Sequence, residues 1–297
     1  MRRSPFLLLL LCLSCSTPPS PPTMRVSALF ETLSVKSSAG DDSAIASLDL
    51  LVFRDGQLDA HARALHSAAV EASVTAGVPL RWYVLANAPE GMGQLQSESA
   101  FLHSAMELTK GPLAMKASGQ DLFQGSENHV AGILLNRYAC KISVDALEVS
   151  WLEAFDRPPL CSLEQMGLLH ARRRIPWSGE AEGAADGDWE DRMDICEKAI
   201  PGPAPVRLDT QLYTLPNASE DQPTCLAIAL RIDGVLQWYV TPLPELHANT
   251  HYRIFRILLP GPGNALPQMD SQRCNMELLV QVEPWENKQA YIQFPNV

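Results

Sequence analysis

The chain has 297 residues, of which 46% are hydrophobic and 19% charged, and its formal net charge is −11. This length suggests one or two domains with apolar cores. The acidic balance argues against nucleic acid or anionic lipid as a general partner.

The first residues have the pattern of a secretory signal. A basic head at 1–3 precedes an apolar run at 6–13, which is too short for the roughly 20 residues of a membrane-spanning helix. Cys12 and Cys15 follow within this segment. The alternative is a redox or zinc CxxC motif, but no βαβ pattern surrounds the pair. We therefore expect a signal peptide at 1–14.

The end of this segment resembles the box at which bacterial lipoproteins receive a diacylglyceryl group. Cys15 follows Leu13 and Ser14, although Cys12 stands where leucine is usual. Plain secretion without a lipid is the alternative. We expect Cys15 to be the lipid attachment site and 15–23 to be a proline-rich tether. Such proline density favours extended polyproline II, although a structureless leader remnant is the other interpretation.

Alternation of apolar and polar residues with period two dominates the first half of the chain. Between 64 and 77, Val70, Ala72 and Val74 fall on one face, which favours a half-buried strand over a helix. A helix is expected at 97–108, capped by Ser97 or Ser99. The other expected strands occupy 25–35, 47–54, 79–89, 130–151 and 166–175.

An acidic, glycine-rich stretch at 178–194 and a PGPAP run then interrupt the pattern. They predict a linker or long loop at 179–205, between an N-terminal β-sandwich domain at 24–178 and a C-terminal one at 206–297. Within the second half, Asp233-Gly234 separates two apolar runs and indicates a hairpin. The expected strands of this half occupy 207–217, 224–232, 235–240, 250–259, 276–285 and 290–294.

No motif in the sequence carries recognisable chemistry. His247 and His251 are four apart, but they flank a predicted turn rather than lie on a helix, so a zinc site is not expected. The glycines near 91 and 261 lack the context of a phosphate-binding loop, and no G-x-S-x-G elbow is present. A glycosidase carboxylate pair has no local signature. We expect no catalytic residue, no metal and no cofactor.

Other motifs have simple structural interpretations. The run 172–174, three arginines, is interpreted as an exposed strand edge, with a proteolytic site or basic patch as alternatives. Asn217 fits the N-glycosylation pattern, a match that a bacterial leader makes accidental. Five cysteines after Cys15 have no metal-ligand spacing or disulfide framework, so mostly buried thiols are expected. They are Cys140, Cys161, Cys196, Cys225 and Cys274.

A series of short motifs resembles the Bacteroidia fimbrillin superfamily, whose members build type V pili. In the first half these are LDLLVFRDGQL, WYVLANAP, PLAMKASG and LLNRYACKISV. In the second half they are LYTLPN, TCLAIAL, WYVTPL, HANTHYRIFRILLPGPG and LLVQVEPW. Their order matches the family over roughly 48–285.

This resemblance implies a mostly β fold with two transthyretin-like sandwich domains and few short helices, and a structural role. The chain would be an outer-membrane lipoprotein of a fimbria, an anchor or minor subunit because of its short tether, with stalk or tip roles as alternatives. Its partners would be other fimbrial subunits, bound by β-strand complementation, and the outer membrane, bound through the lipid. A carbohydrate-binding surface lipoprotein is an alternative that the dispersed tryptophans disfavour.

Overall fold

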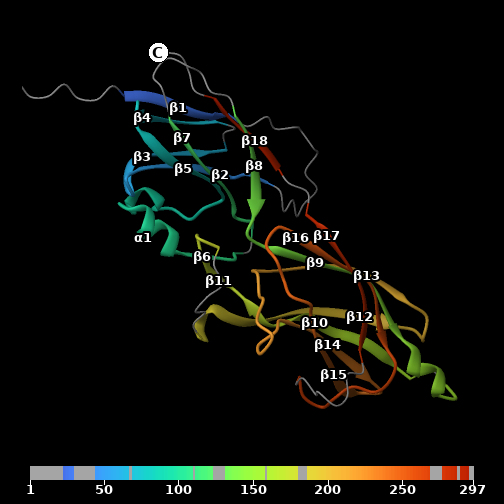
Figure 1. The fold of residues 1–297 in the computed structure, drawn as a ribbon. Helices are drawn as coiled ribbons and strands as arrows, with labels where there is room; N and C mark the ends of the chain where they lie inside the picture. The colour runs from blue at the N-terminus through green and yellow to red at the C-terminus, as the bar shows by residue number, and fades with distance from the viewer. Residues whose placement is uncertain are drawn as a thin grey trace, which may run out of the picture.

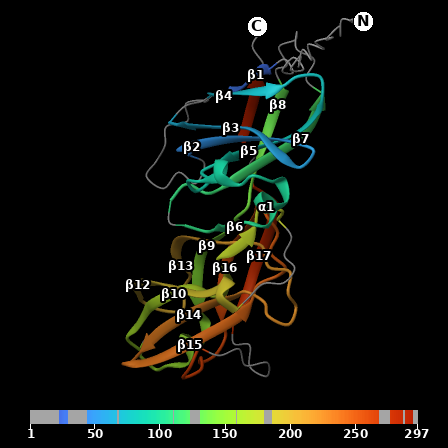
Figure 2. The same ribbon diagram turned by 90° about the vertical axis from the view of Figure 1, so that its left-hand side faces the viewer.

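The computed structural model describes residues 23–29, 44–66, 69–109, 111–122, 131–157, 159–179, 186–267, 276–285 and 288–293. These residues form a mostly β structure with a single α-helix and three short 3-10 helices, as expected. The strands form two sandwiches placed end to end, with a small connecting sheet between them (Figures 1 and 2). The predicted signal peptide, the lipid site Cys15 and Cys274 lie outside the described residues.

The N-terminal sandwich is one folded sheet with the strand order β3-β2-β5-β7-β8-β18-β1-β4. Its strands are β1 (Thr23–Leu29), β2 (Ser47–Arg54), β3 (Gln57–Leu65), β4 (Ala69–Thr75), β5 (Pro79–Ala86), β7 (Met115–Leu122), β8 (Ala131–Arg137) and β18 (Lys288–Gln293). The sheet folds over so that β4 lies against β2 and β3. One apolar core is enclosed, to which β2, β4, β5, β7 and β8 contribute.

Local sequence accounts for two features of this sandwich. Asp55 and Gly56 both have positive φ, 49° and 75°, as a two-residue type I′ hairpin turn requires, and they join β2 to β3. The alternating segment is strand β4, in which Val70, Ala72 and Val74 are buried while Ser73 is exposed. The expected strand is therefore confirmed despite its alanine content.

The C-terminal sandwich has two four-stranded sheets, β12-β10-β14-β15 and β13-β9-β16-β17, which enclose a single core. Its strands are β9 (Cys140–Val149), β10 (Cys161–Arg172), β12 (Trp189–Ile200), β13 (Val206–Thr214), β14 (Cys225–Ile232), β15 (Val235–Pro242), β16 (Thr250–Leu259) and β17 (Glu277–Pro284). Strands β9 and β16 pair in parallel. The predicted hairpin is confirmed, because Asp233 and Gly234 have φ of 47° and 85° between β14 and β15. The short helices η2 (Ser150–Ala154) and η3 (Asp186–Asp188) follow β9 and precede β12.

A third apolar cluster fills the junction between the sandwiches. It lies around η1 (Met92–Gln94), α1 (Glu98–His103) and a two-stranded sheet formed by β6 (Ala105–Glu107) and β11 (Arg174–Pro176). Trp177 is fully buried at its centre, where its ring stacks at 6.1 Å on Phe101 and meets Tyr138 edge-on at 5.2 Å. Because residues from both sandwiches share this core, the junction is packed rather than hinged.

The expected helix is shorter than its apolar pattern suggests. The Ser97 hydroxyl caps it by accepting a hydrogen bond from the Ala100 amide, and it ends at His103. The following residues, Ala105–Glu107, form β6 instead. The pairing of β6 with β11, a segment far along the chain, overrides the local helical pattern.

The expected linker and domain limits need correction. Much of 179–205 is strand β12, which pairs with β10 along its length. It is an edge strand with charged residues on a half-exposed surface, and for that reason it resembles a solvated loop in sequence. Strands β9 and β10 pair with the second half of the chain, and β18 pairs with the first. We therefore propose a domain boundary between β8 and β9 in place of 178.

The cysteines of the described residues are thiols rather than disulfides. Cys140, Cys161 and Cys225 are buried, as expected, whereas Cys196 is only partly buried. Burial raises the pKa of Cys161 and of Cys225 to about 11, so both stay protonated at neutral pH. These thiols act as small apolar core residues.

Candidate functional site: the sheet that holds the terminal strands

The first and last described strands, β1 and β18, lie side by side in the N-terminal sandwich, and we call them the terminal strands (Figure 1). Residues 27–29 of β1 pair antiparallel with 291–293 of β18. The second edge of β1 pairs with β4 along its full length. The second edge of β18 pairs with β8, from Lys288 opposite Leu135 to Ile292 opposite Ala131. Both terminal strands are therefore interior strands of the sheet.

An interior strand that belongs to a chain end has a special property. It can leave the sheet without unthreading any other strand, and its departure exposes two rows of main-chain donors and acceptors. A vacated position between two strands is the geometry in which an extended segment of another chain adds by main-chain hydrogen bonding.

The sheet positions next to the terminal strands face an apolar core. On β4, Val70 and Val74 are buried, and on β8, Ile133 and Leu135 are buried. They pack in one cluster with residues of the opposite strands β2 and β5. A strand that enters between β8 and β4 therefore covers apolar surface as well as main-chain groups, which is the larger part of the gain on burial.

Within this sheet, β7 and β8 pair among the described residues where Met115 and Lys116 meet Arg137 and Asn136. A cavity of about 470 Å³ lies next to this pairing, lined in part by Trp82, Ala117 and Ile133.

Lys116 lies at the inner end of this cavity, toward the junction. Its ammonium group donates a hydrogen bond to the Trp177 carbonyl at 2.6 Å and lies 5.4 Å from the ring centroid of Tyr138. Burial lowers the pKa of Lys116. Its aromatic and carbonyl partners compensate part of the lost hydration, so the lysine fixes β7 to the junction core.

Two asparagines of the family-like motifs hold the connections around the site. Asn87, at the end of β5, has φ of 57°; its amide donates to the carbonyls of Ala44 and Leu113, and its oxygen accepts from the Ala46 amide. It ties the start of β2 to the chain before β7. The αL conformation is one that asparagine tolerates better than most residues.

Asn249 holds the place where the chain crosses between the sandwiches. Its backbone amide donates to the Ala139 carbonyl, and its carbonyl accepts from the Trp285 amide. Its side-chain oxygen accepts from the Arg137 amide. The guanidinium of Arg137 lies 4.6 Å from the Trp285 ring centroid. The segment that leads into β18 is therefore fixed to the segment that leaves β8.

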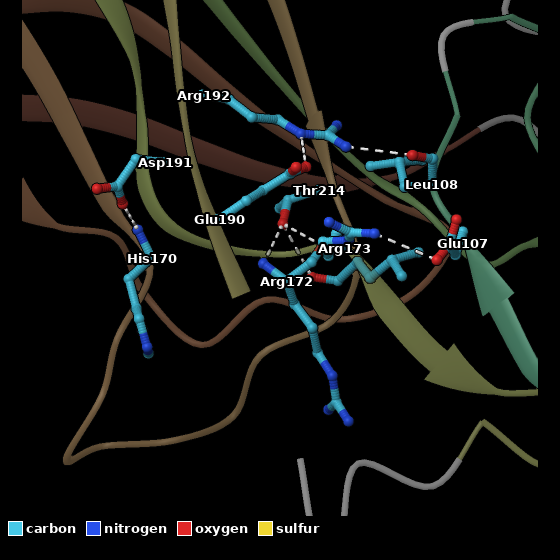
Figure 3. Close-up of polar contacts among 10 residues, drawn as sticks. Glu107, Leu108, His170, Arg172, Arg173, Glu190, Asp191, Arg192 and Thr214 are labelled. Carbon is cyan, nitrogen blue, oxygen red and sulfur yellow. Dashed lines mark hydrogen bonds and ion pairs between the residues drawn. The ribbon is translucent and has the colours of Figure 1, made fainter. Parts of the chain in front are cut away.

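Arg172 and Arg173 lie close to the junction (Figure 3), and Arg174 begins the short junction strand β11, where it is exposed. Arg172 is only 3% exposed; its amide donates to the Thr214 hydroxyl, and its guanidinium lies 5.7 Å from the Trp189 ring centroid. Arg173 and Arg174 both form ion pairs with Glu107 of the junction strand β6. The run therefore contributes to the junction, with Arg172 buried and the other two side chains partly exposed.

Strand β12 adds further contacts in the same region (Figure 3). Arg192 pairs with Glu190 and donates to the carbonyl of Leu108, which follows the junction strand β6, at 3.1 Å. The Asp191 carboxylate accepts from the amide of His170, whose ring stacks on Trp189 at 4.2 Å. A cleft of about 750 Å³ next to these residues separates the edge strands β12 and β13.

The histidine pair considered from sequence is not brought together as a metal site. His247 is exposed, whereas His251 is mostly buried between Ser143 and Glu283. Among the described residues, no group of three or more His, Cys, Asp or Glu side chains is arranged to hold a metal ion. Within the same residues, no helix is long and apolar enough to cross a membrane.

This architecture is similar to that of several solved structures, although sequence comparisons find no match. No known family profile matches the chain, and no curated protein resembles it in sequence. A fimbrilin from Porphyromonas gingivalis superposes with a TM-score of 0.61 at 15% identity, over 88% of this chain and 97% of its own. The protein has a fimbrillin fold.

Two further solved structures share this fold. A provisionally assigned cell adhesion protein from Bacteroides eggerthii superposes with a TM-score of 0.64 at 18% identity, over 91% of this chain and 98% of its own. A similarly assigned protein from Parabacteroides distasonis reaches 0.62 at 16% identity, over 89% and 97%. The resemblance noted from the short motifs is thus confirmed at the level of the fold.

Proposed function

We propose that the protein is a structural subunit of a fimbria, an anchor or minor subunit that joins its neighbours by exchange of a β-strand. The single observation that carries this proposal is the position of β1 and β18, which are adjacent interior strands of one sheet. The fimbrillin fold of the chain and the fimbrial or adhesive description of its structural neighbours support it.

In this proposal the N-terminal sandwich is the assembling domain. When a terminal strand moves into the sheet of a second subunit, that subunit regains the hydrogen-bond ladder and the apolar cover that its own strand provided. The packed junction around Trp177 then transmits force between the two sandwiches of each subunit. No catalysis is required for this role.

The proposal includes attachment to the outer membrane through a lipid on Cys15. It is motivated by Leu13-Ser14-Cys15 at the end of the apolar leader. Mass spectrometry of the mature N-terminus is expected to show a diacylglyceryl cysteine. A Cys15→Ala protein is expected to leave the membrane fraction, and its continued fractionation with membranes would contradict the assignment.

Strand exchange is tested by deleting 289–297, which removes most of β18. We expect the truncated protein to reach the membrane but not to enter pili. A deletion of 294–297 alone, which spares β18, is the matched control and should assemble normally. Removing β18 also takes a strand from the protein's own sheet, so loss of assembly alone does not demonstrate strand exchange. A synthetic 288–297 peptide is therefore added to the purified truncated protein, to test whether the vacated position accepts a strand.

Binding of this peptide at 1:1 stoichiometry, with recovery of thermal stability, is the expected result. Normal pilus assembly by the truncated protein would show that β18 has only a structural role. Failure of the peptide to bind would show that the vacated position does not accept a strand.

A further inference from the structure

The outer face of the sheet β13-β9-β16-β17 carries a linear chain of three side chains from three adjacent strands. The Ser143 hydroxyl oxygen on β9 lies 2.8 Å from Nε2 of His251 on β16. Nδ1 of the same imidazole lies 2.9 Å from a carboxylate oxygen of Glu283 on β17. A serine, a histidine and a carboxylate are thus joined in the order that defines an acyl-transfer triad.

Strand register explains why these residues meet. His251 is directly opposite Glu283 in the antiparallel pair and opposite Lys141 in the parallel pair. Ser143 is two residues beyond Lys141, and residues two apart in a strand point to the same face. All of them therefore lie on the outer face, while Tyr252, between His251 and Arg253, points into the core.

The protonation pattern of the three groups follows from their partners. The Glu283 carboxylate accepts a hydrogen bond from Nδ1–H of His251, so Nε2 carries no hydrogen and accepts one from the Ser143 hydroxyl. Burial, Lys141 and Arg253 lower the pKa of His251 below its ordinary value of 6.5, against the opposing effect of Glu283. The imidazole is therefore neutral at pH 7, the state that a general base requires.

The charged and titratable groups around His251 come from all four strands. They are Lys141 and Asp145 on β9, Arg253 on β16, Glu283 on β17 and Tyr213 on β13. Arg253 is held by two hydrogen bonds to the Asp145 carboxylate, at 2.9 Å and 2.8 Å, and is directly opposite Ser143. Lys141 precedes Ser143 by two residues and Arg253 is opposite it, so both cations lie on the same sheet face as the serine.

We propose that Ser143, His251 and Glu283 form a hydrolytic triad that cleaves carboxylic esters. Ser143 lines neither cavity described above, so the substrate approaches an open sheet face. The geometry therefore fits a short acyl group carried on an extended or surface-bound molecule. This activity is additional to the proposed assembly role, which uses the other sandwich.

The reaction balances with water as the only co-reactant. The Ser143 oxygen attacks the ester carbonyl carbon while its proton passes to Nε2 of His251. The tetrahedral intermediate collapses, the carbon–oxygen bond to the alcohol breaks, and the alcohol leaves with the proton from Nε2. Water then attacks the acyl-serine by the same route, which releases the carboxylic acid and restores the hydroxyl.

The test uses the purified full chain with p-nitrophenyl acetate as substrate and a fluorophosphonate probe for the serine. We expect hydrolysis above the buffer rate and covalent labelling on the peptide that contains Ser143. Ser143→Ala should abolish labelling and lower the rate about 100-fold, or to the buffer rate. The matched control is Ser162→Ala on β10, because the Ser162 hydroxyl donates to the Glu164 carboxylate rather than to an imidazole.

Two further readouts separate a triad from a merely structural hydrogen-bond chain. His251→Gln should abolish labelling of Ser143. Glu283→Gln should still be labelled, but at a lower rate than the wild type. The wild-type rate should rise with pH through one step below 6.5 and stay level above it. A change in the near-UV circular dichroism of Ser143→Ala would mean that this variant is misfolded. In that case the His251 and Glu283 variants and the pH profile serve as the test instead. Absence of labelling in the wild type, or equal labelling in the Ser143→Ala protein, overturns the proposal.

Discussion

The two sandwiches of this protein differ in how the chain builds them. The C-terminal sandwich is made from β9 to β17, a continuous series interrupted only by the small strand β11. The N-terminal sandwich takes its last strand, β18, from the other end of the sequence and places it beside β1. In the N-terminal sandwich, β1 or β18 can therefore leave without unthreading the other strands, whereas each strand of the C-terminal sandwich is connected along the chain on both sides.

Trp177 lies in the core that couples the two sandwiches. Trp177→Ala removes a fully buried ring between Phe101 and Tyr138, and it should lower the free energy of unfolding by about 3–5 kcal/mol. We expect one cooperative denaturation transition to split into two, measured by urea titration with hydrogen exchange. Trp177→Phe is the milder control. A loss below about 1 kcal/mol would show that the sandwiches are coupled elsewhere.

A core substitution in the C-terminal sandwich should leave the terminal strands unaffected. Ile254 is fully buried there, and Ile254→Ala is expected to cost about 2–5 kcal/mol. Amide exchange through local openings should accelerate in β14 and β16, while local openings of β8 stay unchanged because it belongs to another core. The effect of Ile254→Ala on stability should add to that of removing 289–297. Strong non-additivity would mean that Ile254 and β18 depend on the same contacts.

Asn87→Ala tests the connection that frames the N-terminal sandwich. The substitution removes the side-chain hydrogen bonds to the carbonyls of Ala44 and Leu113 and to the amide of Ala46. It also places an alanine at a position with positive φ. We expect a loss of about 1–3 kcal/mol in unfolding free energy. Asn87→Asp keeps the acceptor but sets a carboxylate oxygen against the Ala44 and Leu113 carbonyls, so it should lose at least as much. If both variants equal the wild type in thermal unfolding, water replaces these hydrogen bonds.

The smallest expected effect is a pH dependence within the N-terminal sandwich. Asp49 is fully buried, with one carboxylate oxygen 2.9 Å from His61 Nε2 and the other 3.1 Å from the Arg63 guanidinium. Burial raises the pKa of Asp49 above 3.8, and its two partners only partly offset this. The folded state then binds a proton more readily than the unfolded state, so this carboxylate favours folding below its unfolded pKa and loses that contribution as pH rises through the folded one.

The measurement compares wild type with Asp49→Asn in urea titrations between pH 3 and pH 7. The wild type should gain less stability than the variant as pH rises through the titration of Asp49. Parallel pH profiles would show that His61 and Arg63 fully compensate for the burial of the carboxylate.

Some of the site was accessible from sequence and some was not. The alternation of Val70, Ala72 and Val74 and the asparagine motifs at 87 and 249 were visible locally, and each has a defined structural role. The triad candidate has no local signature, because Ser143 and His251 are 108 positions apart and meet only through the parallel pairing of β9 with β16. The same holds for the charged edge strand β12, whose polar composition indicated a linker.

The β class, the turns at Asp55-Gly56 and Asp233-Gly234, and the alternating strands can all be inferred from local sequence. These features depend on the φ preferences of single residues and on a period of two within a few positions. The membership of β9 and β10 in the second sandwich, and the return of β18 to the first, follow instead from tertiary packing. The reason is that a half-apolar strand matches many partners locally, and the choice among them depends on the core that all the strands bury together.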